Sequence, residues 1–322
     1  MNSILILEQN PVYQNVLKQI LSKNGYNCII NEDETSGLSS LENNKFKFVL
    51  IDLDIAKHAK KIIDTIIEKY KVPLVLTCDE NIEKHYNFIL KHEIMQILIK
   101  PIKSDELLTI ANKLCNFSEK NLFGLTNYLS NIKQIHKIEI ISSNQIRGVI
   151  AEVMSLITQM NFASTMKMEI SLVLQEILTN AVYHSHGFSD KKEAGEPLEL
   201  PSPYKVIVEY GMSDSKFGIS VRDYCGTLIY DKIINPLKKA AKQQALIEDS
   251  IKKGIDVSEK ISTSGRGLDL IRRLTGEHYF IINPNKSTEI ITIYDGIFET
   301  DSAYSGLRIF QLPDTSKKAE KK

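Results

Sequence analysis

The sequence predicts an α/β protein with two domains, a doubly wound five-stranded parallel sheet at the N-terminus and an α/β sandwich at the C-terminus. In the first 117 residues, short apolar runs alternate with segments of helical periodicity. The second half instead begins with helical segments and ends with apolar runs typical of strands. A length of 322 residues is ample for two hydrophobic cores.

Five strand–helix units follow one another in the first half, which is the pattern of a parallel sheet with helices on both faces. Strands are expected at 3–8, 27–30, 47–54, 72–78 and 95–101. Helices are expected at 12–26, 34–44, 60–70, 81–92 and 104–117. Gly25 is the expected stop of the first helix, and Ser104 is the expected N-cap of the last.

The composition is that of an ordinary globular protein and excludes several classes. Hydrophobic residues make up 43% and charged residues 25%, with 40 basic and 40 acidic side chains. This balance gives no electrostatic footprint for nucleic acid. The N-terminus lacks the features of a signal peptide, and no apolar run is long enough to span a membrane. Four scattered cysteines favour reduced thiols, so we expect a cytoplasmic protein without membrane partners.

Polar residues stand at the carboxyl ends of four expected strands, where parallel sheets bind ligands. They are Glu8, Asp52, Thr77 and Lys100. Carboxylates can hold Mg²⁺, an aspartate can accept a phosphoryl group, and a lysine with a hydroxyl can hold the product. Each residue alone could be an ordinary polar strand end, but together they predict a phosphoryl-accepting site.

Residues 3–116 resemble a response-regulator receiver domain, through the segments "ILILEQNP", "VLIDLDIA", "LVLTC" and "ILIKPI". The resemblance implies a flavodoxin-like fold, with Asp52 as phosphoacceptor and Thr77 and Lys100 as the switch and phosphate-binding residues. It also implies a cis bond before Pro101 and a weak Mg²⁺ site at Glu8 and Asp52.

The sequence departs from the receiver pattern at three positions. Gln9 replaces one acid of the usual pair, Ile97 replaces a common aromatic residue, and Ala56 replaces a common proline. Two interpretations therefore stay open: a phosphorylated receiver, or a pseudo-receiver that acts as a docking or dimer surface.

We expect domains at 1–117 and 137–300, a connector at 118–136 and a C-terminal segment with a polar tail at 301–322. In the second domain, Glu176 and Asn180 lie four residues apart and share one helix face. An apolar strand ends at Asp223, three residues before Gly226.

A further segment, "STSGRGLDLIRRL", brings Gly265, Arg266 and Gly267 to the start of an amphipathic helix. Glycines at a helix N-terminus allow backbone N–H groups to approach a phosphate, although a glycine turn that only begins the helix is the simpler interpretation.

In order along the chain, "QEILTNAVYH", "VRDYCG" and "SGRGLDLIRRL" resemble the ATPase domain shared by histidine kinases, gyrase, Hsp90-type chaperones and, most closely, anti-sigma factor serine kinases. The resemblance covers about residues 137–296. It implies ATP and Mg²⁺ as cofactors, with Glu176 as the catalytic base, Asn180 as the Mg²⁺ ligand and Asp223 as the acceptor for the adenine amine. The nucleotide-binding residues that it implies are Asn180, Asp223, Gly226, Gly265, Arg266, Gly267, Leu268 and Thr288.

The same resemblance makes residues 228–263 a flexible lid over the nucleotide. Cys225 stands where the family usually has glycine, and the insert 187–203 is longer than in the simplest members. The insert is expected to be a surface loop, either an ordinary insertion or a partner surface.

Two functions of different kinds follow. The first is a two-component response regulator whose ATPase-like domain phosphorylates a serine or threonine of an anti-sigma antagonist. The second is an ATP-gated binding module that holds a sigma factor or another regulator without phosphotransfer. In both, phosphorylation of Asp52 by an upstream histidine kinase is the expected input, and a homodimer is left open.

Overall fold

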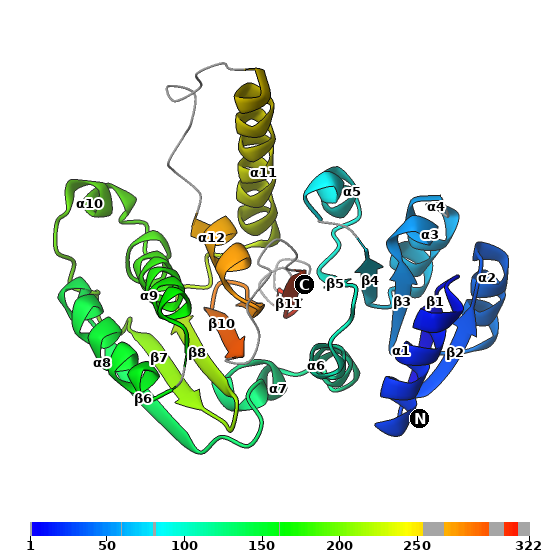
Figure 1. Cartoon of the computed structure of the whole chain (residues 1–322), viewed down its shortest axis with the longest axis horizontal. Helices are drawn as coiled ribbons and strands as arrows, with labels where there is room; N and C mark the ends of the chain where they lie inside the picture. Colours follow the sequence, from blue (N-terminus) through cyan, green and yellow to red (C-terminus); the bar gives the residue numbers. More distant parts are fainter. Residues whose placement is uncertain are drawn as a thin grey trace, which may run out of the picture. The chain divides into compact units, whose positions relative to one another are not determined.

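The computed structural model describes residues 2–58, 60–79, 82–160, 162–253, 267–295 and 306–314. The chain divides into two compact units (Figure 1). The first unit comprises Met1–Leu122 and Gly306–Arg308, and the second comprises Phe123–Ser305 and Ile309–Lys322.

The first unit contains the doubly wound parallel sheet that the sequence predicts. Its parallel strands, in the order β2-β1-β3-β4-β5, are β1 (Ser3–Leu7), β2 (Asn27–Asn31), β3 (Phe48–Asp52), β4 (Leu74–Cys78) and β5 (Gln96–Ile99). Its helices are α1 (Pro11–Lys23), α2 (Glu34–Asn43), α3 (Leu53–His58), α4 (Lys60–Asp64), the π-helix η1 (Thr65–Tyr70), the 3-10 helix η2 (Ile82–His85), α5 (Tyr86–Lys91), α6 (Ser104–Cys115) and α7 (Glu119–Leu122). Every residue of β3 and β4 is buried, as expected for central strands covered on both faces.

Local details of this unit correct some expectations. Ser104 is not the N-cap of α6 but its first residue; Lys103 occupies the cap position, and no side chain caps the helix. The single helix expected at 60–70 is divided into α4 and the π-helical η1. The Lys100–Pro101 peptide bond is cis, as the sequence predicts.

One strand has no counterpart among the expectations. β11 (Leu307–Gln311) lies in the C-terminal segment 301–322, for which no strand was expected. Leu307 and Arg308 pair antiparallel with β5 of the first unit. Arg308 is buried, and its Nε donates to Oε1 of the buried Glu106 at 2.7 Å. The charge of Arg308 is therefore balanced within the first unit by a residue far away in sequence.

The second unit is built on a mixed sheet in the order β11-β9-β10-β8-β7-β6, to which β11 contributes Ile309–Gln311. Its strands are β6 (Gln134–Ile140), β7 (Val206–Met212), β8 (Lys216–Asp223), β9 (Glu277–Asn283) and β10 (Ser287–Asp295). Its helical segments are η3 (Leu125–Asn127), η4 (Ser143–Gln145), α8 (Ile146–Thr158), α9 (Ser164–Thr179), the π-helix η5 (Asn180–His184), α10 (Ser189–Ala194), α11 (Tyr230–Lys253) and α12 (Gly267–Leu274). Helices α8 and α9 lie side by side along one face of the sheet (Figure 1).

Helix α11 differs from the flexible lid that the resemblance implies for residues 228–263. Residues Tyr230–Lys253 form a continuous helix with Pro236 inside it. Figure 1 shows α11 extending away from the sheet of this unit. The remainder of the expected lid, from residue 254 onward, lies outside the described residues.

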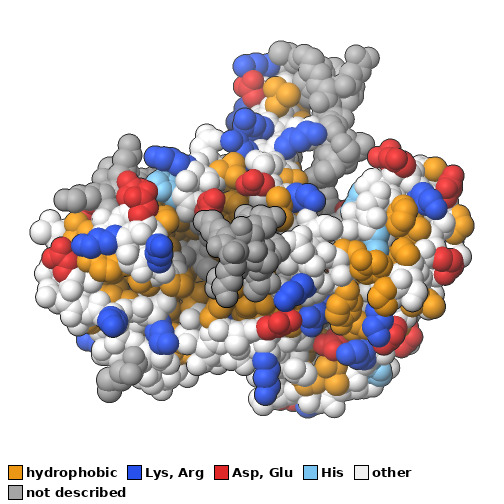
Figure 2. All heavy atoms as spheres, turned by 180° about the vertical axis from the view of Figure 1, so that it is seen from behind, with side chains coloured by type: hydrophobic (Ala, Val, Ile, Leu, Met, Phe, Trp, Pro, Cys, Tyr) orange, Lys and Arg blue, Asp and Glu red, His pale blue; other side chains and the backbone are white. Residues whose placement is uncertain are grey.

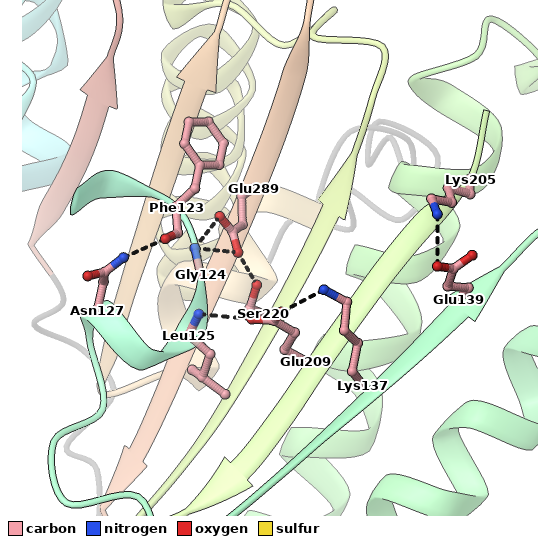
Figure 3. Close-up of polar contacts among 10 residues, drawn as sticks. All are labelled: Phe123, Gly124, Leu125, Asn127, Lys137, Glu139, Lys205, Glu209, Ser220 and Glu289. Atoms are coloured by element: carbon pink, nitrogen blue, oxygen red, sulfur yellow. Dashed lines mark hydrogen bonds and ion pairs between the residues drawn. The ribbon is translucent and has the colours of Figure 1, made fainter. Parts of the chain in front are cut away.

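The opposite face of the second sheet is covered by residues 123–129 (Figure 3), which we name the strap. The side chains of Phe123, Leu125, Tyr128 and Leu129 are buried there. A Cβ atom on Gly218 of β8 would lie 2.8 Å from the Leu125 side chain, so the strap packs closely on the strand at this glycine. The residues joining the two halves of the sequence thus belong largely to the second core.

Glu289 of β10 binds the strap through its buried carboxylate (Figure 3). Its Oε2 accepts a hydrogen bond from the Gly124 N–H at 2.9 Å, and its Oε1 accepts one from the Ser220 hydroxyl. The N–H of Leu125 donates to Glu209 at 3.2 Å. Burial raises the pKa of Glu289, while the bonds from Ser220 and Gly124 oppose that rise. The strap is therefore held by acceptors that strands β7 and β10 supply.

We predict that Glu289→Ala lowers the free energy of unfolding by about 2 kcal/mol, because it leaves the Gly124 N–H and the Ser220 hydroxyl without their acceptor in a buried place. Urea denaturation at pH 7 measures this change.

The matched control is Glu139→Ala, since Glu139 forms an exposed ion pair with Lys205 at 2.8 Å on the same sheet (Figure 3). Losing an exposed pair changes stability by less than about 1 kcal/mol. Equal effects of the two variants would contradict the role given to Glu289.

Candidate functional site

In the first unit, the parallel strands bring the predicted acceptor residues to one edge of the sheet. Lys100 Nζ lies 2.8 Å from Asp52 Oδ2 and 2.9 Å from Glu8 Oε2. All three side chains are buried. Burial alone would lower the pKa of Lys100, but its hydrogen bonds and charge interactions with Asp52 and Glu8 outweigh burial and raise it well above its ordinary value. Lys100 is therefore a permanent cation between two carboxylates.

Thr77 lies beside Asp52 in the register of β3 and β4. Its hydroxyl is buried and has no hydrogen-bond partner among the described residues. A buried polar atom without a partner is uncommon and indicates a place for a ligand atom. Asp52 Oδ1, meanwhile, accepts a hydrogen bond from the Asp54 N–H at 2.9 Å.

Two contacts of Lys100 were not predicted. Asp79 Oδ1 lies 3.7 Å from Lys100 Nζ, and the Tyr13 ring centroid lies 4.4 Å from it. Asp79 could have been predicted from its position just after β4, because the other site residues also lie at strand ends of this sheet. Gln9 is exposed and brings no carboxylate to the site. Among the described residues, no three His, Cys, Asp or Glu side chains form a metal-binding group.

The second unit contains a cavity of about 440 Å³ among α9, η5, β8, β10, α11 and α12. This cavity is lined by six of the site residues that the sequence predicts, and these come from four separate segments of the chain. They are Glu176, Asn180, Asp223, Gly267, Leu268 and Thr288. Gly226 supports the cavity from the turn after β8, while Gly265 and Arg266 lie outside the described residues.

Asp223 is the buried anion of this cavity. Its Oδ1 accepts hydrogen bonds from the N–H groups of Cys225 at 2.9 Å and Gly226 at 3.2 Å, whereas Oδ2 accepts none from the residues that the structure describes. Burial raises the pKa of Asp223 to about 6, and the two backbone bonds limit the rise. Asp223 therefore offers one carboxylate oxygen to a ligand in an apolar setting.

The turn after Asp223 requires glycine at position 226. Gly226 has a φ of +61°, and a Cβ atom there would overlap the backbone of Asn283 and Lys286. Across the cavity wall, Thr288 pairs with Asp223 in the register of β8 and β10. The Thr288 hydroxyl is buried, and no described residue binds it.

At another part of the cavity, the Asn180 amide donates to Glu176 Oε1 at 3.1 Å, as their spacing predicts. This bond leaves the amide oxygen of Asn180 as an acceptor or metal ligand. A Cβ atom at Gly267 would overlap the Glu176 carboxylate, so the first residue of α12 lies directly against this side chain. The helix N-terminus and the Glu176–Asn180 pair therefore lie against one another.

The cavity also contains residues that the sequence analysis missed. Lys192 and His184 line it, and so do Thr227 and Lys232 from the segment after Asp223. Lys192 comes from the insert that was expected to be a surface loop. The sequence offered two hints of this part of the cavity: the lysines of the insert, and the histidine four residues after Asn180.

Comparison with known proteins assigns the first unit. Residues 4–112 match the family model of the response regulator receiver domain. They form a receiver domain. None of the curated proteins matches the chain.

Solved structures with similarity to the chain include a response regulator from Thermotoga maritima, at 18% identity and a TM-score of 0.34, covering 36% of this chain and 98% of that one. A CheY-like receiver domain protein from Methanospirillum hungatei has 20% identity and a TM-score of 0.34, covering 37% of this chain and 98% of that one. The receiver domain of a sensor histidine kinase from Pseudomonas aeruginosa, solved with a magnesium ion in its active site cleft, has 24% identity and a TM-score of 0.33, covering 36% and 98%.

The receiver domain of this chain is built on the parallel sheet β2-β1-β3-β4-β5, with Glu8, Asp52, Thr77 and Lys100 at the carboxyl ends of its strands. On the face shown in Figure 2, basic and acidic side chains are interspersed rather than gathered by sign.

Within the described part of the chain, no helix has the length and apolar character needed to cross a membrane.

Proposed function

We propose that the chain is a response regulator whose second unit is an output domain that binds ATP and Mg²⁺. This domain transfers the terminal phosphate to a serine or threonine of a regulatory protein, of the anti-sigma antagonist type. The proposal depends on one observation: a single cavity joins a buried carboxylate, Asp223, with the Glu176–Asn180 pair and the N-terminus of α12.

The chemistry of the cavity fits an adenine nucleotide. The open oxygen of Asp223 suits the exocyclic amine of adenine, and the unpartnered Thr288 hydroxyl lies on the neighbouring strand. The N-terminus of α12, which begins with Gly267 and lies against Glu176, suits the phosphates.

The donor set also fits Mg²⁺, which proteins bind through a few oxygen ligands together with substrate phosphates. Asn180 would supply its amide oxygen, because its amide nitrogen is bound to Glu176. When bound, the ion neutralises charge on the phosphates during transfer. In the receiver domain, Glu8 and Asp52 would supply two carboxylates, fewer than the family pattern offers because Gln9 replaces the second acid.

Glu176 is the proposed catalytic base. It would take the proton of the partner's hydroxyl as that oxygen bonds to the terminal phosphorus, while the bond to the bridging oxygen breaks and ADP leaves. Asn180 orients the carboxylate through the 3.1 Å hydrogen bond.

A second candidate is an ATP-gated binding module that holds a sigma factor or similar regulator without phosphotransfer. The arrangement of Glu176 favours it, since this carboxylate is bound to Asn180 and lies against Gly267. A partner complex that requires Asn180 but not Glu176 would support this candidate over the kinase.

The receiver domain is the proposed input. Asp52 would accept a phosphoryl group from an upstream histidine kinase, Lys100 would neutralise it, and Thr77 would donate its unpartnered hydroxyl to it. The signal would then reach the output domain through the connector, whose strap residues Gly124 and Leu125 are bound to the output sheet.

Calorimetry with Mg²⁺-ATP tests the nucleotide site. At pH 7.5 the carboxyl of Asp223, with a pKa of about 6, is ionised and accepts the adenine amine, so we expect Asp223→Asn to raise Kd roughly tenfold.

At pH 5 the wild-type carboxyl is protonated and the strong acceptor is lost, so the wild-type affinity should fall toward that of the variant. The ionisation of ATP changes with pH in the same way for both proteins. The ratio of their two Kd values at each pH therefore reports the effect of Asp223 alone. A ratio that does not change between pH 7.5 and pH 5 would contradict the assignment.

Phosphotransfer is tested with γ-labelled ATP and a purified anti-sigma antagonist as acceptor. We expect Glu176→Gln to bind ATP like the wild type but to transfer phosphate at least about 100-fold more slowly, because the base is missing. Equal and negligible labelling by both proteins would exclude the kinase and leave the binding module.

Receiver phosphorylation is tested with acetyl phosphate and Mg²⁺, followed by intact-mass measurement. One added phosphoryl group is expected on the wild type and none on Asp52→Asn. An unmodified wild type would support the pseudo-receiver interpretation instead.

A further inference from the structure

The insert 187–203 forms an ordered element against the helix that contains Asn180. Helix α10 of this insert is joined to His184, the last residue of η5, at two points. His184 Nδ1 lies 2.7 Å from the Ser189 hydroxyl, and His184 Nε2 lies 3.1 Å from Lys192 Nζ. The Tyr183 hydroxyl donates to the carbonyl of Glu196 at 3.0 Å, which ties the end of α10 to the same helix.

These contacts determine the state of the imidazole. A lysine ammonium is only a donor, so Nε2 of His184 accepts from Lys192 and Nδ1 donates to Ser189. Burial, followed by the charge of Lys192, lowers the pKa of His184, which keeps the ring neutral at pH 7. Lys192 is therefore bound to a neutral imidazole that is itself hydrogen-bonded to Ser189.

Lys192 lies at the Glu176 end of the cavity. Both Lys192 and His184 line the cavity, and the charge of Glu176 acts on His184 strongly enough to oppose the lowering of its pKa. The other lysine of the cavity wall, Lys232, is bound instead to the carbonyl of Thr227, in the segment after Asp223. Lys192 is thus bound to the helical segment that follows Asn180, whereas the ammonium of Lys232 is bound to a backbone carbonyl.

Building on the proposed ATP site, we infer that Lys192 binds the terminal phosphate of the nucleotide and makes the site prefer ATP over ADP. Of its three N–H donors one is used by His184, so two remain for phosphate oxygens. The positive charge also offsets the repulsion that Glu176 would impose on a triphosphate. The insert then has a specific role, since it supplies a phosphate ligand that the motifs of the rest of the domain do not.

The test compares Lys192→Met with Lys191→Met, a control in the same short helix. The Lys191 ammonium lies 5.4 Å from the Phe188 ring centroid and is not among the cavity residues. Calorimetry with Mg²⁺ and either a non-hydrolysable ATP analogue or ADP gives four dissociation constants for the variants and two for the wild type. Thermal melting verifies that each protein is folded.

For Lys192→Met we expect the analogue to bind roughly tenfold more weakly while ADP changes less than about twofold. Lys191→Met should bind both ligands like the wild type. Unchanged binding by Lys192→Met, or equal losses for both nucleotides, would overturn the terminal-phosphate role while leaving the ATP site intact. If the folded wild type binds neither nucleotide, the proposed function itself fails.

Discussion

The second unit is organised around the cost of burying the Asp223 carboxylate. Its desolvation is compensated at one oxygen by two N–H groups of the turn that follows β8, and that turn exists because Gly226 adopts a left-handed conformation. The pKa of about 6 shows that the compensation is incomplete. The second oxygen of this buried carboxyl can therefore accept a hydrogen bond from a ligand. In the proposed complex, the adenine amine donates that bond.

In the receiver domain, by contrast, the buried carboxylates already have a cation as partner. Lys100 lies between Glu8 and Asp52, and Asp79 lies near the same ammonium. What remains unsatisfied is the Thr77 hydroxyl. An incoming phosphoryl group would compete with Glu8 and Asp52 for the Lys100 ammonium. The site therefore contains a cation that can bind a phosphoryl group, but it has few carboxylates that could bind a metal ion. In the proposed phosphorylated form, Lys100 would therefore bind the phosphoryl group, while Gln9 would offer no carboxylate to a metal ion.

Sequence reasoning recovered the parts of the molecule that depend on periodicity and strand ends. The five strand–helix units of the receiver domain and the polar residues at its strand ends follow from local patterns, whereas its flavodoxin-like fold was expected from the family resemblance. Strand β11 was not predicted because it is only five residues long and its pairing with β5 and β9 joins residues that are far apart in the sequence. Lys192 escaped because a charged insert is normally a solvated loop, and only its contact with His184 brings it to the cavity.

The central claim is that adenine and the metal-bound phosphates occupy the two ends of one cavity in the second unit. A crystal structure of the chain with Mn²⁺ and a non-hydrolysable ATP analogue tests it most directly, since Mn²⁺ gives an anomalous signal. We predict the anomalous peak at coordination distance from the Asn180 amide oxygen, with the adenine amine on Asp223. A nucleotide bound elsewhere, or a metal ion away from Asn180, would contradict the account.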